Sequence, residues 1–176
     1  MAQKNYTAER SDYMTPFSIY STLLQIAQRE IFDIDVCCSR KNIPAIHHFI
    51  DGRRDGLKEV WHGDCFLNPP FKTAVKWIRK AVEAVKDSDN TRVFAVIPAD
   101  RLETKYYQEC ILKNKYCVFC FLPYKAGFII PGQEDQPPKP SQKIMIAIFS
   151  KDASVINYAW DFHNWFNTLS FLGRDF

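Results

Sequence analysis

Apolar positions recur along the chain at the spacings of helices and of buried strands. Helical spacing predicts helices over residues 16 to about 30, 72–86, 100 to about 113 and 154–172. Thr15 followed by Pro16 is typical of a helix start, and Asp100 with Glu103 forms a capping-box-like start for the third helix. Apolar runs predict buried strands at residues 65–67, 92–97, 116–122 and 143–150, and residues 32–38, which alternate and then become apolar, predict another.

The order of these elements predicts the fold class. Helices alternate with strands over most of the chain, which is typical of an α/β protein with a mostly parallel sheet. Residues 123–142 are proline-rich and predict a long irregular loop, so the strands that they join should pair antiparallel. Residues 40–61 predict mostly loop, with a short strand at 45–50 as an alternative. We expect one domain over residues 1–176, in which residues 151–176 are an aromatic helical extension.

Composition excludes some classes of function. The chain has six glycines, and no two are separated by a single residue, so G-x-G dinucleotide fingerprints are absent. The P-loop pattern does not occur in the chain either. The net charge of +3 permits a nucleic-acid partner without demanding one. The first ten residues are polar and no apolar run reaches a membrane span, so we expect a soluble, unexported protein whose six cysteines are reduced.

The most informative motif is Asn68-Pro69-Pro70-Phe71, at the carboxyl end of a predicted strand, where open α/β sheets bind ligands. The side-chain amide oxygen of Asn68 and the carbonyl of Pro69 could accept both protons of an exocyclic amine. This would make the amine nitrogen more nucleophilic, and Phe71 would offer a stacking face for the ring. The alternative is that Pro69 and Pro70 end the strand and Phe71 belongs to the core.

The motif and several others in the same order resemble the phage-type DNA N6-adenine methyltransferases, the Dam family. The other motifs are Tyr13-Met14-Thr15-Pro16, Ile34-Asp35-Val36-Cys37-Cys38-Ser39 with Asn42, Asp55-Gly56-Leu57 with Trp61, Trp77, Pro98 with Arg101 and Thr104, and Pro140-Ser141. Together they span residues 12–150, the family-like core. The resemblance implies a Rossmann-like fold of the enzymes that use S-adenosylmethionine (AdoMet), and methylation of adenine N6 in DNA, in the cytoplasm of a bacterial host cell.

The resemblance also implies a cofactor site. Thr15 and Pro16 would line it beside the methionine part of AdoMet, and Asp35 would face the cofactor. A carboxylate within an apolar strand is costly unless paired, so Asp35 meets either an internal cation or a ligand. The glycine-rich turn that is usual in enzymes of this kind is absent here, and Cys37 and Ser39 stand in its place. Asn42 and Asp55 are candidates for ribose or adenine contacts, with turn positions as the alternative.

Double-stranded DNA is the expected partner, and the adenine would have to be flipped out of the helix and stacked on Phe71. Candidate phosphate contacts are the basic residues on either side of the motif, for which ordinary surface charge is the alternative. These are Arg40, Lys41, Arg53, Arg54, Lys125 and Lys139.

We expect no metal, because Cys117 and Cys120 lie three apart in a predicted strand and point to opposite faces. The aromatic C-terminal helix could pack on its own sheet or form a homodimer. Two other functions are compatible with the motifs. One is N-methylation of RNA adenine or of a glutamine amide, and the other is a non-catalytic module that binds DNA or a protein.

Overall fold

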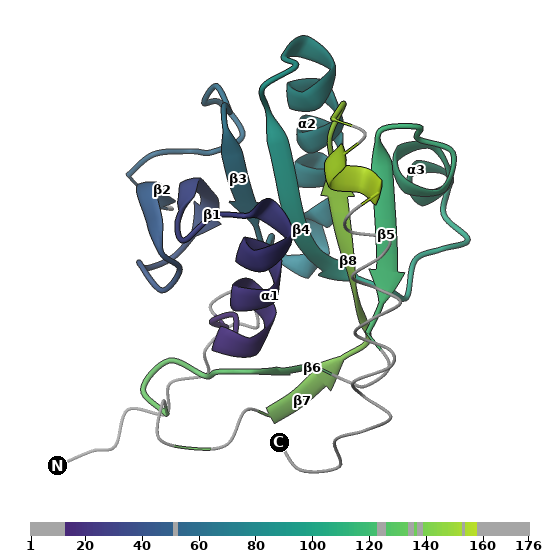
Figure 1. Ribbon diagram of the computed structural model, residues 1–176. Helices are drawn as coiled ribbons and strands as arrows, with labels where there is room; N and C mark the ends of the chain where they lie inside the picture. The colour runs from purple at the N-terminus through teal and green to yellow at the C-terminus, as the bar shows by residue number, and fades with distance from the viewer. Residues whose placement is uncertain are drawn as a thin grey trace, which may run out of the picture.

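The computed structural model describes residues 13–50, 53–122, 126–133, 136, 139–152 and 154–157. Figure 1 shows a central sheet with helices on both faces and a small ribbon of two strands at one end. In chain order the named elements are α1 (Phe17–Ala27), β1 (Phe32–Cys38), β2 (Ala45–Ile50), β3 (Asp64–Leu67), the 3-10 helix η2 (Phe71–Thr73), α2 (Ala74–Asp87), β4 (Arg92–Pro98), α3 (Lys105–Tyr107), the π-helix η3 (Gln108–Leu112), β5 (Cys117–Phe121), β6 (Ala126–Phe128), β7 (Lys139–Gln142) and β8 (Ile144–Phe149).

The main sheet is six-stranded, in the order β2-β1-β3-β4-β8-β5. Neighbours from β2 to β4 pair in parallel, while β8 is antiparallel to both β4 and β5. The predicted α/β class, with a mostly parallel sheet and an antiparallel strand late in the chain, is confirmed. The topology is that of the Rossmann-like methyltransferase fold. The parallel strands end at the lower edge of the sheet in Figure 1, beside the β6–β7 ribbon.

The sheet is covered on both faces, which explains the continuous apolar runs of its central strands. Every residue of β8 is buried, as are six of the seven in β4. One face packs against α1 through residues such as Phe66, Phe94 and Val96. The other face packs against α2 and α3 through Cys65, Leu67 and Ala95. Neighbouring residues of β3 and β4 therefore alternate between two separate apolar layers.

The first strands fit the predicted pattern closely. Strand β1 has the predicted bounds. Residues 45–50 form β2, which confirms the short strand within a stretch that was predicted to be mostly loop. The pattern was ambiguous because β2 is an edge strand whose residues Ile46 and His47 are exposed.

Helix α1 starts at Phe17, one residue after the predicted start, with Pro16 as its N-cap and no side-chain cap from Thr15, and it ends earlier than predicted, at Ala27. The reason is a left-handed residue at Gln28, with φ of 56°, whose amide bonds back to the carbonyls of Gln25 and Leu24. Glutamine carries no strong preference for this conformation, so nothing in the local sequence indicated the end.

The third predicted helix is also shorter than expected, and its predicted cap is wrong. Helix α3 begins at Lys105 with Thr104 as its N-cap, not at Asp100. Residues 101–104 instead form a turn, in which the Thr104 amide and hydroxyl donate to the carbonyl of Arg101. The helix then widens into the π-helix η3, where Asn114 bonds the carbonyl of Cys110.

The stretch at 123–142 was predicted to be irregular, whereas its ends form the antiparallel ribbon of β6 and β7. The prediction was wrong there because it took the high proline content as a sign of irregular structure. Both strands of a two-stranded ribbon are edges, so a proline such as Pro140 can sit in one without breaking a central ladder. The ribbon joins the segment before α1, because Met14 and Ile129 exchange backbone hydrogen bonds of 2.9 and 3.0 Å.

At the amino end of the strands, a buried carboxylate is neutralised by two arginines. Asp64 is 3% exposed and accepts two hydrogen bonds from Arg92, one of them 2.7 Å, while Arg29 lies 3.7 Å away. The Asp64 amide donates to Asp33 at 2.7 Å. This network holds the starts of β1, β3 and β4 together.

Residues 154–157 form a helical turn, and the rest of the predicted C-terminal helix, with the aromatic residues of the homodimer hypothesis, lies outside the described residues. Within the described part of the chain, no helix is long and apolar enough to cross a membrane.

Gly56 is required by a close approach between the loop after β2 and strand β1. A Cβ at this position would collide with the carbonyl oxygen of Val36 and come within 3.1 Å of the Trp77 ring. Trp61 stacks on Trp77 at 6.3 Å and donates to the Gly56 carbonyl at 2.8 Å. The Asp55-Gly56-Leu57 and Trp61 motifs thus hold β1 from the α2 side.

We therefore expect Gly56→Ala to lower the free energy of unfolding by more than about 2 kcal/mol, because backbone must move to admit the methyl group. Gly132→Ala is the control: its φ of 80° disfavours alanine, but nothing lies within 4 Å. Its cost should be about 1 kcal/mol. Urea unfolding of both variants measures the difference, and equal losses would contradict the steric role of Gly56.

Candidate functional site

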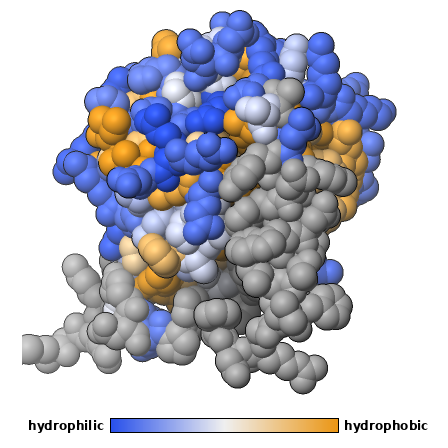
Figure 2. Space-filling model, viewed as in Figure 1, coloured by the Kyte–Doolittle hydropathy of each residue, from blue (hydrophilic) through white to orange (hydrophobic). Residues whose placement is uncertain are grey.

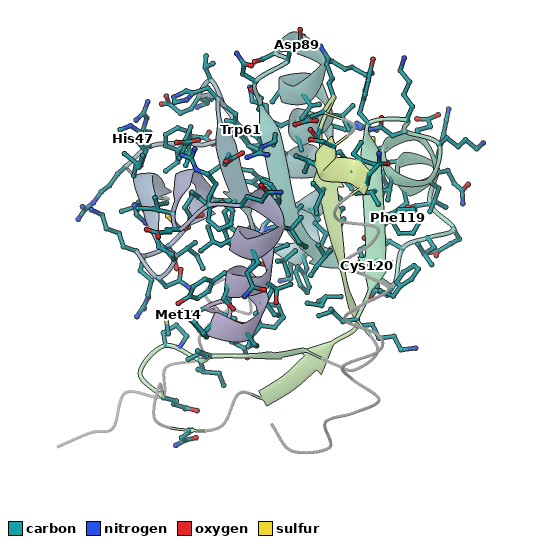
Figure 3. The ribbon with its side chains drawn as sticks, viewed as in Figure 1. Met14, His47, Trp61, Asp89, Phe119 and Cys120 are labelled. Carbon is teal, nitrogen blue, oxygen red and sulfur yellow. The ribbon has the colours of Figure 1, made fainter. Side chains whose placement is uncertain are left out.

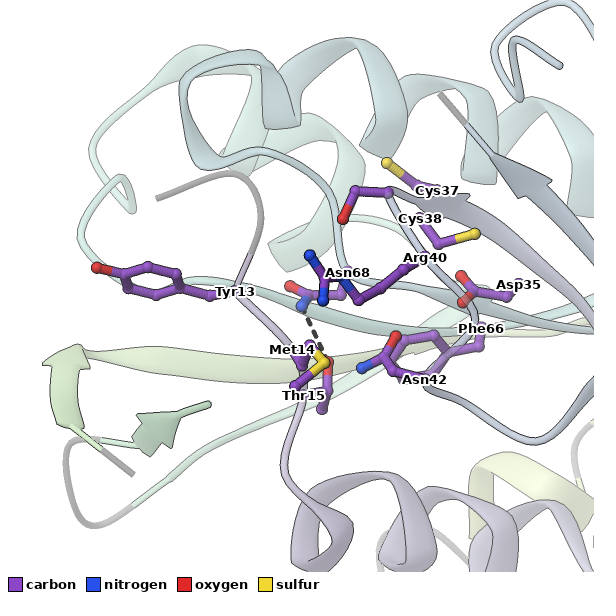
Figure 4. A pocket seen from close by; sticks show the side chains of 11 residues that line it. Tyr13, Met14, Thr15, Asp35, Cys37, Cys38, Arg40, Asn42, Phe66 and Asn68 are labelled. Atoms are coloured by element: carbon purple, nitrogen blue, oxygen red, sulfur yellow. Dashed lines mark hydrogen bonds between the residues drawn. The ribbon is translucent and has the colours of Figure 1, made fainter. Parts of the chain in front are cut away.

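A pocket opens on the α1 side of the sheet, near the carboxyl ends of β1 and β3 (Figure 4). It is built from three separate parts of the chain: the segment before α1, the end of β1 with the loop that follows, and β3 with the residue after it. The lining residues are Tyr13, Met14, Thr15, Asp35, Cys37, Cys38, Ser39, Arg40, Asn42, Phe66 and Asn68. Figure 3 shows Met14 at the same edge of the sheet, beside the ribbon.

Asp35 is the most unusual residue of the pocket. It lies within β1 opposite Phe66 of β3 and is 1% exposed. Neither carboxylate oxygen has a hydrogen-bond partner among the described residues. Burial raises the pKa of Asp35 to about 7, and the nearby backbone of Cys37 and thiol of Cys38 offset only part of this effect. The internal ion pair that was one alternative for Asp35 is not formed with any described residue.

The thiol of Cys38 lies in the same buried environment as Asp35. Burial and the Asp35 carboxylate raise the pKa of Cys38 to about 12. Cys38 therefore remains a neutral thiol at physiological pH, and its sulfur donates to the Phe49 carbonyl at 3.5 Å. Asp35 is thus the one carboxylic acid of the pocket lining.

A hydrogen bond across the pocket orients Asn68. Its side-chain Nδ2 donates to the Thr15 hydroxyl at 2.9 Å, joining the residue after β3 to the segment before α1 (Figure 4). Thr15 is itself 3% exposed, so the pair is held rigidly. With Nδ2 committed to Thr15, the amide presents Oδ1 as an acceptor to a ligand.

The two prolines have different surroundings. The Pro70 carbonyl accepts the Thr73 amide at 2.9 Å and starts the turn of η2. The carbonyl of buried Pro69 accepts no hydrogen bond from the described residues. Asn68 Oδ1 and Pro69 O are thus the two acceptors that the motif leaves for an amine.

Phe71 lies beside the pocket and is not part of its lining. It is half-buried, and its ring meets that of Phe128 edge-on, with centroids 6.2 Å apart. Phe128 belongs to the ribbon, so the motif and the ribbon are in direct contact.

The predicted cofactor residues divide into two groups. The pocket brings together Thr15, Asp35, Cys37, Ser39 and Asn42. Pro16 is buried just outside it, as the N-cap of α1. Asp55 lies away from it in a turn, where its carboxylate accepts the Leu57 amide at 3.0 Å and pairs with Lys58. The structure thus gives Asp55 the turn position that was its alternative.

The candidate DNA contacts are dispersed. Arg40 lines the pocket, and Lys41 and Arg53 are exposed. Arg54 is occupied, since it pairs with Glu59 at 2.7 Å and lies over the Phe49 ring. Lys125 and the Lys139 side chain lie outside the described residues. The face shown in Figure 2 is largely hydrophilic, with small apolar patches.

Sequence reasoning gave no role to Tyr13, Met14 or Phe66, all of which line the pocket. The Tyr13-Met14 dipeptide was noticed as part of a motif, but only the bridge to Ile129 shows why it lies at the site. From the sequence alone, Phe66 cannot be distinguished from the other apolar residues of its strand.

Three or more possible metal ligands do not cluster anywhere within the described ranges. His47 and Cys120 lie on β2 and β5, the opposite edges of the sheet (Figure 3).

The lining fits the cofactor that the motifs imply. AdoMet carries a sulfonium, an ammonium and a carboxylate beside ribose hydroxyls, and the pocket offers an unpaired buried acid, a cation at Arg40 and the small polar side chains of Thr15, Ser39 and Asn42. These groups suit a ligand that is both charged and rich in hydroxyls.

Comparison with known proteins gives one result. The model of the family described as DNA N-6-adenine-methyltransferase (Dam) matches residues 3–159. No curated protein and no solved structure gives a significant match to the chain.

The raised pKa of Asp35 predicts an unusual dependence of stability on pH. Between pH 3.8, where the unfolded carboxyl ionises, and about pH 7, the native state retains a proton that the unfolded chain has released. The free energy of unfolding of the ligand-free protein should therefore fall as pH rises across this window. Asp35→Asn should lose this dependence and be more stable than the wild type at pH 8, while binding AdoMet more weakly.

Urea unfolding across this pH range, with calorimetry of AdoMet binding, checks both effects. The control is Asp64→Asn, which removes a paired carboxylate and should destabilise the protein at pH 8. A loss of stability in Asp35→Asn at pH 8 would show that Asp35 has an internal partner.

Proposed function

The chain belongs to the DNA N-6-adenine-methyltransferase (Dam) family, and on this premise we propose that Asn68 and Pro69 hold the N6 amine of a flipped adenine for methyl transfer from AdoMet in this pocket. Family membership itself makes the protein an AdoMet-dependent enzyme that methylates adenine N6 in DNA. The proposal concerns the residues that carry out this reaction.

The observation that supports it is the hydrogen bond from Asn68 Nδ2 to Thr15. It commits Nδ2 to Thr15 and leaves Oδ1 as an acceptor, and the carbonyl of the next residue, Pro69, accepts no hydrogen bond from the described residues. In our proposal these two oxygens accept both N–H bonds of one amine. Accepting them shifts the nitrogen lone pair out of conjugation with the ring and aims it at the methyl donor. The acceleration then comes from positioning and fixed dipoles, without a separate general base.

AdoMet supplies an electrophilic methyl group on its sulfonium sulfur. Asp35 offers negative charge on the cofactor side of the pocket, while Thr15, Ser39 and Asn42 offer hydroxyl and amide groups for the remaining polar atoms. Burial of Asp35 strengthens its attraction for a cation, because the surroundings screen charge weakly.

Duplex DNA would approach from the carboxyl edge of the sheet, where the pocket opens. An adenine reaches it only if it is flipped out of the stack, and the half-buried ring of Phe71 would receive one face of the base. The exposed Lys41 and Arg53 are our candidates for contacts to phosphate. Arg54 is a weaker candidate because Glu59 already neutralises it.

Asn68→Ala should reduce methyl transfer to duplex DNA by at least about 100-fold, since both the acceptor and its orientation are lost. Binding of AdoMet should change by less than about threefold, because Pro69 and Asp35 remain in place. Tritiated AdoMet with duplex DNA, followed by nucleoside mapping, measures the product. Transfer to RNA or to a glutamine amide, or cofactor binding without N6-methyladenine, would overturn the DNA assignment.

Thr15→Val should lower kcat by about 10- to 100-fold, because Asn68 Nδ2 loses its acceptor and the amide is free to rotate. Thr15→Ser keeps the hydroxyl and should retain most of the wild-type kcat. Steady-state kinetics with saturating AdoMet separates kcat from KM for DNA. If valine and serine variants have the same kcat, Thr15 does not orient Asn68.

A further inference from the structure

Arg40 is placed differently from the other basic residues near the motif. It follows β1 by two positions and lines the pocket, whereas its neighbour Lys41 is exposed and does not. Figure 4 shows its side chain extending from the end of β1 along the pocket, toward the side on which Asn68 lies. No described carboxylate forms an ion pair with it, unlike Arg54, which is paired with Glu59.

The pocket lining holds one carboxyl group and one guanidinium. Asp35 is its only Asp or Glu and Arg40 its only Lys or Arg, and they do not form an ion pair with each other. A cationic group of a ligand beside Asp35 would favour its ionised form. Two unpaired opposite charges in one pocket suit a ligand that carries both signs. A nucleic-acid phosphate carries negative charge alone and leaves the buried acid unsatisfied.

The amino-acid end of AdoMet has this charge pattern, with one carboxylate and a cationic ammonium close to the sulfonium. We propose that Arg40 binds the carboxylate of the methionine part of AdoMet while Asp35 faces its cationic part. An arginine suits this role, because its planar guanidinium donates two parallel hydrogen bonds to a carboxylate. The inference rests on the proposed function in placing the cofactor in this pocket, and it removes Arg40 from the candidate phosphate contacts.

The test compares two ligands on the full chain without DNA. One is AdoMet and the other is decarboxylated AdoMet, which has hydrogen in place of the carboxylate. Calorimetry gives the affinity of wild type, Arg40→Met and the matched control Lys41→Met for each. Thermal melting without ligand checks folding, and because Arg40 is exposed and makes no ion pair, Arg40→Met should melt with the wild type.

We expect Arg40→Met to weaken AdoMet binding by about tenfold or more and to leave decarboxylated AdoMet within about twofold. Lys41→Met should change neither ligand. Asp35→Asn should weaken both ligands, since both keep the ammonium and the sulfonium. Arg40→Lys should recover part of the affinity for AdoMet alone.

Two outcomes would overturn the inference while leaving the proposed function in place. In one, Arg40→Met binds AdoMet as the wild type does but binds DNA more weakly, with a smaller dependence on salt, which would return Arg40 to the phosphate backbone. In the other, both ligands are weakened equally. Failure of the wild type to bind AdoMet at all would overturn the proposed function and this inference together.

Discussion

A carboxylate buried in a protein must be paired, protonated or supplied with a ligand, and this constraint separates the two ends of the sheet. At the amino end, Asp64 is surrounded by Arg92 and Arg29. Toward the carboxyl end, Asp35 is at least as deeply buried and has no partner among the described residues. The same chain can neutralise a buried acid, so the lack of a described partner for Asp35 supports our proposal that a bound ligand completes the site.

The site also depends on contacts between distant parts of the chain. Thr15 precedes the first helix, yet it fixes the amide of Asn68 after β3. The backbone bridge from Met14 to Ile129 then fastens the same segment to the ribbon, whose Phe128 touches Phe71. The segment before α1 and the Asn-Pro-Pro-Phe motif are thus both in contact with the region of the ribbon, the first through Ile129 and the second through Phe128.

Much of the fold could be predicted from the sequence, because its main strands are apolar runs long enough to show burial on both faces. The bounds of β1 and the antiparallel position of β8 followed from such runs and from the connections between them. The end of α1, the late start of α3 and the ribbon could not be predicted, because they rest on a left-handed glutamine, a local turn and pairing between proline-containing edges. The spacing of apolar residues along the chain says little about these three features.

The residues of the candidate site also divide into those that the sequence indicates and those that it does not. Asn68 and Asp35 stand out by their residue type in an apolar context, whereas the motif residue Asp55 has a structural role in a turn. Its neighbour Gly56 has a structural role as well. Gly56 allows the loop to approach the Val36 carbonyl from the α2 side, one residue beyond Asp35. A larger residue at position 56 would displace the strand that carries Asp35, so this motif supports the pocket from outside its lining.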